Sequence, residues 1–149
     1  MPNARREKFL KELEEALAEL QPALRVIKRD HPITIEGMFS LQSPDGPIDT
    51  YQIRIELNDD FPNVEPVVFE TGNRIPKLIE RHVNPGGNCC ITVWESWLAT
   101  AKDQTFRAYL TGPIQEFFLN QFFYEQTGKW RLGDALRRAR DTRRQLRLA

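Results

Sequence analysis

The sequence is poor in the residues that bind metals and form disulfide bonds. Its 149 residues contain two cysteines and two histidines, and no CxxC pair. The two cysteines, Cys89 and Cys90, are adjacent, so a bridge between them would require a strained small ring. Adjacent cysteines rarely both fit one tetrahedral ion. The composition therefore argues against a zinc site.

The sequence also lacks long apolar runs and an excess of one charge. The formal net charge is zero, which argues against binding to nucleic acid or to a membrane surface by the whole protein. No apolar run is long enough to span a bilayer, and residues 1–6 lack the apolar core of a signal peptide. We therefore expect a cytoplasmic protein whose cysteines are thiols.

The hydrophobic pattern predicts one α+β domain over residues 1–149. Helical spacing of apolar residues is followed by four segments of strand character with turn residues between them, which is typical of an antiparallel meander. A second helical region contains Gly112 and Pro113, and a late start of that helix at these two residues is the alternative. The expected helices are 5–20, 107–123 and a basic C-terminal helix at about 130–149, and the expected strands are 24–28, 33–41, 51–57 and 66–70.

A short loop after the fourth strand holds the residues that suggest chemistry. It contains His82, Asn84 and both cysteines, within residues 82–93. A thiol is the best ordinary nucleophile at neutral pH, and an Asn amide can donate to a developing oxyanion. If the segment is extended, Cys89, Ile91 and Val93 share an apolar face that enters the core, and Cys90 is exposed. Burial of both cysteines in the core is the alternative.

Three short motifs together carry a family resemblance. The segment 60–69, Asp-Phe-Pro-Asn-Val-Glu-Pro-Val-Val-Phe, resembles the signature that the ubiquitin-conjugating enzyme family has at its third and fourth strands. His82-Val83-Asn84 resembles its His-Pro-Asn motif. Gly87-Asn88-Cys89-Cys90-Ile91 resembles its Gly-x-Ile-Cys-Leu element, and Trp97 lies near a family tryptophan. The resemblance covers roughly residues 5–123.

This resemblance implies a fold and site residues. The implied fold has an N-terminal helix, a four-stranded antiparallel meander, an active-site cysteine loop and C-terminal helices. The implied catalytic residues are Cys90 as nucleophile, Asn84 as oxyanion donor and His82, which holds the loop through hydrogen bonds of its ring. The resemblance implies no metal and no organic cofactor in this chain. Val83 replaces the family's proline, and Asn84 stands six residues before Cys90, closer than in the family. These departures resemble divergent stand-alone bacterial members found in antiphage defence operons.

The implied function is transfer of an acyl group through a thioester on Cys90. The donor would be a ubiquitin-like protein or another protein C-terminus, supplied by an activating enzyme, and the acceptor an amine or thiol of a protein target. A catalytically inactive binding module of the same fold is the alternative, although inactive relatives generally lack the cysteine. An unrelated cysteine hydrolase or redox protein is a third interpretation, and adjacent cysteines are a poor geometry for a cycling dithiol.

Several residues of this region also have ordinary structural interpretations. Asn84 before a proline is a common turn residue, and His82 could instead form a Cys–His dyad. Cys89 is either a small buried residue or a resolving thiol. The aromatic side chains of Trp94, Trp97 and Phe106 form either a wall of the site or part of the core. The basic C-terminal segment either binds an acidic partner or is a solvated helix face.

Overall fold

The computed structural model describes residues 2–130, and these form an α+β domain. It begins with helix α1 (Pro2–Leu20), followed by strands β1 (Leu24–Lys28), β2 (Ile33–Ser43), β3 (Gly46–Leu57) and β4 (Val67–Glu70). After a loop come a 3-10 turn, η1 (Ile79–Arg81), and helices α2 (Trp94–Thr100) and α3 (Phe106–Tyr109). The chain continues through a π-helical segment, η2 (Leu110–Ile114), into α4 (Gln115–Thr127). The predicted α+β class, with an N-terminal helix, four strands and later helices, is confirmed.

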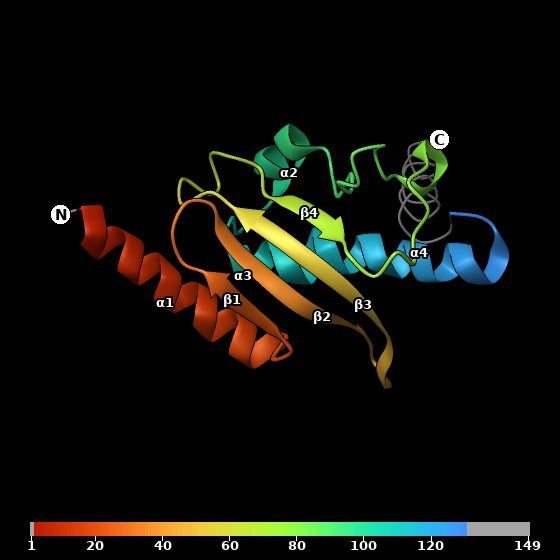
Figure 1. Cartoon of the computed structure of the whole chain (residues 1–149), viewed down its shortest axis with the longest axis horizontal. Coiled ribbons are helices and arrows are strands. Elements are labelled where there is room, and N and C mark those ends of the chain that lie inside the picture. The colour runs from red at the N-terminus through yellow and green to blue at the C-terminus, as the bar shows by residue number, and fades with distance from the viewer. Residues whose placement is uncertain (1, 131–149) are drawn as a thin grey trace, which may run out of the picture.

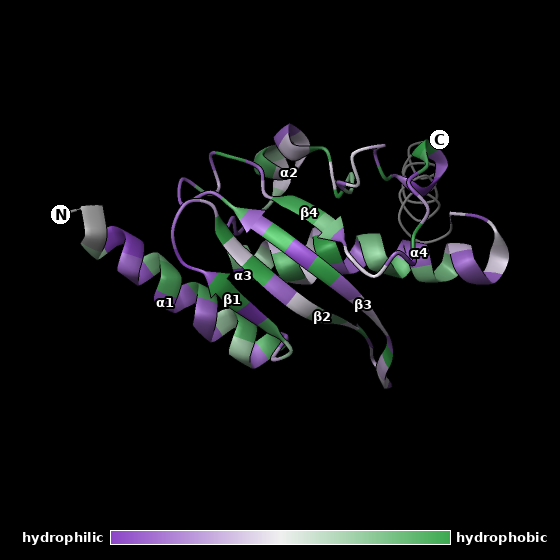
Figure 2. Cartoon of the chain, in the orientation of Figure 1, coloured by the Kyte–Doolittle hydropathy of each residue, from purple (hydrophilic) through white to green (hydrophobic). Residues whose placement is uncertain are grey.

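The four strands form one antiparallel sheet in the order β1-β2-β3-β4. Helix α1 contacts β1, and α4 crosses the same face of the sheet against β2 (Figure 1). The long β2–β3 hairpin alternates between hydrophobic and hydrophilic residues (Figure 2), as expected for a sheet with one solvated face.

The hydrophobic core lies between the sheet and this helical layer. The ring centroid of Phe118 in α4 lies 5.4 Å from that of Phe39 and 4.8 Å from that of Tyr51, and all three side chains are buried. Leucines at three positions along one stripe of α1 fill the other half of the core. The buried strand residues include Ile33, Ile35, Leu41, Ile53, Ile55 and Leu57, and those of α1 are Leu10, Leu13 and Leu17.

The β2–β3 hairpin is longer than the sequence predicts. Ser43 pairs with Gly46, so only Pro44 and Asp45 lie between the strands, and β3 begins at Gly46 instead of Tyr51. The register shifts between Leu41 and Gln42. Such a bulge interrupts the alternation of side chains, which is why the periodicity fails to show this end of the hairpin.

Helical structure also departs from the prediction in three places. Helix α1 begins at Pro2, before the predicted start at Arg5. The helix predicted over 107–123 is interrupted by a π-helical segment, η2, rather than starting late at Pro113, because the wider π geometry tolerates a residue without an amide hydrogen. Helix α2 has no counterpart among the expected helices. The predicted basic helix at about 130–149 lies outside the described residues, apart from Trp130.

Candidate functional site

The loop between η1 and α2 folds back on itself and carries both cysteines. The amide of Cys90 donates a hydrogen bond of 2.8 Å to the carbonyl of His82, and the amide of Asn84 donates one of 3.0 Å to the carbonyl of Asn88. Val83 and Cys89 pair as an antiparallel bridge between these two bonds. At the tip, Gly87 has φ of 94°, a conformation that favours glycine. The result is a small hairpin-like loop with a fixed end at Cys90.

This loop is attached to the sheet through Cys89. The amide of Cys89 donates a 2.7 Å hydrogen bond to the carbonyl of Val68 in β4, and Asn88 forms a bridge with Phe69. The side chain of Cys89 is 8% exposed, and burial raises the pKa of its thiol to about 12. A thiol with this pKa is protonated at neutral pH, and the predicted burial of Cys89 is confirmed.

Cys90 has the opposite environment to Cys89. Its side chain is exposed, and neither cysteine forms a disulfide. The predicted alternation of faces therefore holds for the two cysteines and in part for Ile91, which is half-buried and packs against the core. It fails at Val93, which is 65% exposed instead of entering the core. Residues 90–93 belong to no strand, so no ladder fixes their side chains alternately above and below a sheet.

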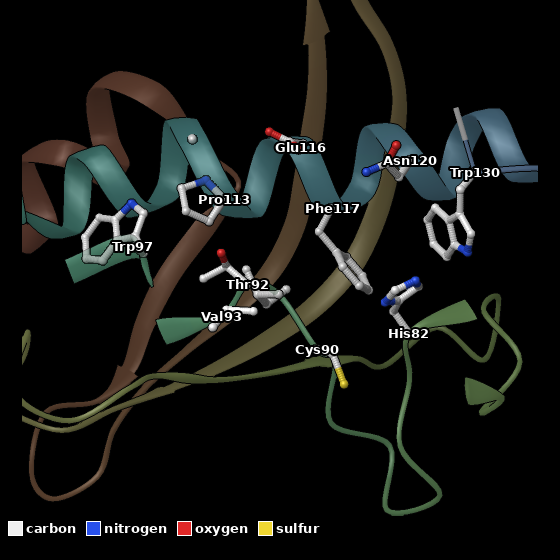
Figure 3. Close-up of a pocket in the computed structure, with 12 residues that line it drawn as sticks. His82, Cys90, Thr92, Val93, Trp97, Pro113, Glu116, Phe117, Asn120 and Trp130 are labelled. Carbon is white, nitrogen blue, oxygen red and sulfur yellow. The ribbon is translucent and has the colours of Figure 1, made fainter. Parts of the chain in front are cut away.

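The exposed thiol lies in a groove with a volume of about 600 Å³. Residues of the cysteine segment form one wall, and one face of η2 and α4 forms the other, with Pro113, Glu116 and Asn120 above Cys90 (Figure 3). Spacings of three and four residues place these three side chains on the same side of the helix. The full lining consists of His82, Cys90, Ile91, Thr92, Val93, Trp97, Gly112, Pro113, Glu116, Phe117, Asn120 and Trp130.

His82 forms one end of this groove together with Trp130. The ring of Trp130 meets the ring of His82 edge-on, with centroids 4.5 Å apart, and its indole N–H donates a 2.6 Å hydrogen bond to the carbonyl of Glu80. His82 itself adopts a left-handed backbone conformation, with φ of 59° and ψ of 37°. Because its carbonyl accepts the amide of Cys90, His82 holds the loop through its backbone.

The aromatic residues after the cysteines divide between the groove and the core. Trp97 lines the groove and stacks on Trp94, with centroids 5.0 Å apart. Trp94 and Phe106 are buried around Phe61, which belongs to the motif after β3. Trp97 is thus the wall of the site, and the other two are core residues. The apolar spacing at positions 94, 97 and 98 is the signal that could have found helix α2.

Only some of the predicted site residues therefore lie together in the groove. His82 and Cys90 line the same groove, whereas Asn84 is not among the described residues that line it. The backbone of Asn84 bonds to Asn88 and accepts from the amide of Gly87 at 2.8 Å, which shapes the turn. The structure adds a different amide, Asn120, which is 8% exposed and lines the groove. The sequence pattern assigns that helix only a buried face and gives no sign of this amide.

Metal binding and membrane insertion can be judged for the same part of the chain. Among residues 2–130, no group of three His, Cys, Asp or Glu side chains is arranged to hold a metal ion. In that range, no helix combines the length and the apolar content that a membrane span requires.

Comparison of the sequence with models of known protein families gives no match, and comparison with curated proteins also gives none.

Proposed function

We propose that this chain is a ubiquitin-conjugating-like enzyme that carries a protein C-terminus as a thioester on Cys90. The observation that carries the proposal is the contrast between the two adjacent thiols: Cys89 is buried, and Cys90 is exposed and lines the groove (Figure 3). The order of elements, helix, four-stranded meander, cysteine loop and helices, agrees with what the sequence resemblance implies. The same resemblance motivates a role in bacterial antiphage defence.

The proposed chemistry consists of two acyl transfers. In the first, the Cys90 thiolate attacks the carbonyl of the thioester on an activating enzyme, a new C–S bond forms, and the activating enzyme's thiolate leaves. In the second, an amine or thiol of the target attacks the same carbonyl, and the Cys90 thiolate leaves as the acceptor loses its proton. Exchange between thioesters is nearly thermoneutral, so the site needs access and geometry more than a strongly perturbed thiol.

The groove suits the extended C-terminal tail of a protein substrate. Its walls contain Ile91, Val93, Trp97, Pro113 and Phe117, which would cover an extended tail on both sides. Polar groups are fewer, with Glu116 and Asn120 on the helical wall. A site of this composition would hold a short, uncharged peptide segment and align its terminal carbonyl with the thiol.

Within this proposal, His82 and Asn84 keep the roles that the resemblance suggests. The carbonyl of His82 accepts the amide of Cys90, and hydrogen bonds of the His82 ring would hold the loop further. Asn84 remains the proposed oxyanion donor, which would require its side chain to reach the carbonyl when a substrate occupies the groove. Loss of one such donor typically lowers the rate by about a hundredfold or more. The role is therefore measurable by comparing Asn84→Ala and Asn120→Ala in the discharge step.

The test is the intact mass of the protein recovered from cells that also carry its neighbouring genes, with and without thiol reductant. A protein-sized adduct that reductant removes, and that is absent from Cys90→Ala but present on Cys89→Ala, would support the proposal. Cys90→Ser should retain the adduct as an oxyester that resists reductant and yields to alkali. An adduct lost only in Cys89→Ala would assign the nucleophile to the other thiol. Absence of any adduct would favour the inactive binding module.

A further inference from the structure

One buried amide connects the helical wall of the groove to the cysteine loop. Gln121 lies in α4 with 0% of its surface exposed, three residues after the buried Phe118. Burying an amide is unfavourable unless its hydrogen bonds are made. Both ends of this amide are bonded to one residue: Nε2 donates to the carbonyl of Arg81 at 2.6 Å, and Oε1 accepts from Nε of Arg81 at 3.0 Å.

Arg81 is held against α4 by more than this pair of bonds. Its guanidinium lies over the ring of Tyr124, 4.5 Å from the centroid, and its Nη2 is 3.9 Å from a carboxylate oxygen of Glu125. The residue is 7% exposed. Side chains of three α4 residues therefore fix Arg81, which is the last residue of η1 and directly precedes His82.

The Arg81 carbonyl belongs to the peptide unit that leads into His82. The hydrogen bond from Gln121 fixes the plane of that unit, and the φ angle of His82 is measured from this plane. His82 is in the left-handed region, which a residue other than glycine occupies only when its surroundings enforce it. Its carbonyl then points at the amide of Cys90. A continuous path of contacts thus runs from Gln121 through Arg81 and His82 to Cys90.

We propose that Gln121 is a positioning residue for Cys90, which sets the backbone of the reactive thiol relative to the α4 wall of the groove. The catalytic consequence of this inference rests on the proposed function. An amide is suited to the position because it donates and accepts at once, whereas a carboxylate only accepts and a thioether does neither. A displacement of about 1 Å at a reacting group can lower a rate by about a hundredfold.

Three variants separate positioning from general stability. Gln121→Met keeps the side-chain length and removes both bonds, and Gln121→Glu keeps an acceptor for Nε of Arg81 but loses the donor to its carbonyl. The matched control is Gln115→Met, on the same helix, which removes a 2.7 Å hydrogen bond from Nε2 to the carbonyl of Gln42. Gln115 is not among the described residues that line the groove. If Gln121→Met does not fold, Gln121→Glu alone tests the proposal.

The first readout is hydrogen exchange of single amides measured by NMR, which does not depend on activity. The amide of Cys90 is bonded to His82, and that of Cys89 is bonded to Val68 in the sheet. In both Gln121 variants the exchange of the Cys90 amide should accelerate by about tenfold or more relative to that of Cys89. Equal acceleration of the two amides, or the same pattern in Gln115→Met, would overturn the inference.

The second readout compares two reactions of the Cys90 thiol. Acyl transfer from an aryl thioester of glycylglycine forms the Cys90 S–C bond and expels the aryl thiolate, whereas alkylation by iodoacetamide needs only access. We expect the Gln121 variants to lose about tenfold to a hundredfold in acyl transfer with little change in alkylation. Unchanged acyl transfer in well-folded Gln121 variants contradicts the inference. The proposed function is judged separately, by the adduct on Cys90 in cells, and its failure leaves the exchange result intact.

Discussion

The amide of Cys90 donates a 2.8 Å hydrogen bond to the carbonyl of His82, eight residues earlier in the chain. This bond closes the cysteine loop at the residue whose thiol is exposed. Cys89 is bonded to the sheet at Val68 on the other side of the loop. Successive residues in such a segment point in opposite directions, so anchoring Cys89 inward leaves Cys90 outward. The backbone thus determines which of two identical thiols can react.

The two thiols should react at very different rates with an alkylating reagent. In the native protein at about pH 8, iodoacetamide should modify Cys90 and leave Cys89 unmodified, because Cys89 is buried and its pKa is raised to about 12. Peptide mapping by mass spectrometry measures each site. In denaturant both should react, which controls for the reagent. Comparable modification of Cys89 in the native protein would show that the loop opens or that the thiol is accessible.

Trp130 should stabilise the end of the groove through two separable contacts. Trp130→Phe keeps an aromatic ring beside His82 but removes the indole donor to the carbonyl of Glu80. We expect a loss of about 0.5–1 kcal/mol in the free energy of unfolding, measured by urea denaturation. Trp130→Ala removes both contacts and should cost more. Equal stability of wild type and both variants would mean that neither contact contributes.

The sequence predicts the sheet and the exposed thiol well because both depend on short-range patterns. Alternation of apolar residues identifies the strand from Tyr51 to Leu57, and alternation along an extended segment places Cys89 inward and Cys90 outward. The same reasoning fails at Val93, because residues 90–93 belong to no strand. Successive side chains there are not held on opposite faces of a sheet. Pattern reasoning is reliable only where a regular backbone enforces the pattern.

The helical wall of the groove could not be predicted in the same way. Glu116 and Asn120 are ordinary polar residues of an amphipathic helix, and nothing in their sequence neighbours links them to Cys90. Their place in the site depends on how α4 crosses the sheet, which is a tertiary relationship. Likewise, Gln121 and Arg81 are 40 residues apart, and their two hydrogen bonds follow from packing.

Asp49 should contribute stability that depends on pH. Its carboxylate accepts hydrogen bonds from Arg74 at 3.0 and 2.5 Å, and this interaction lowers the pKa of Asp49 below the ordinary value of about 4. A lowered folded-state pKa means that the stabilisation is present above the unfolded-state pKa and disappears as pH falls through the folded-state one. Asp49→Asn should therefore be less stable than wild type at pH 7, by about 1 kcal/mol or less for such a solvent-screened pair.

The difference between wild type and Asp49→Asn should shrink as the pH falls below about 4. Thermal or urea unfolding from pH 7 to pH 2.5 measures it. Asp45→Asn, in the exposed turn of the same hairpin, is the control for a general loss of negative charge. A stability difference that stays constant over this range would mean that the substitution acts through packing or strand propensity and not through the ion pair with Arg74.

Gly37 should be the glycine that the sheet can least replace. It lies in β2 with φ of 143°, and a Cβ at this position would come within 2.0 Å of the carbonyl oxygen of Ala23. That carbonyl cannot easily move away, because it accepts the amide of Met38 at 3.3 Å. Gly37→Ala should therefore lower the free energy of unfolding by about 3 kcal/mol or more, measured by urea denaturation.

Gly112→Ala is the control, since a Cβ there would meet no neighbouring atom within 4 Å and the backbone is helical. There alanine should be neutral or stabilising by up to about 1 kcal/mol. Equal effects of the two substitutions would contradict the close approach of β2 to Ala23, and with it the register that places β1 at the edge of the sheet.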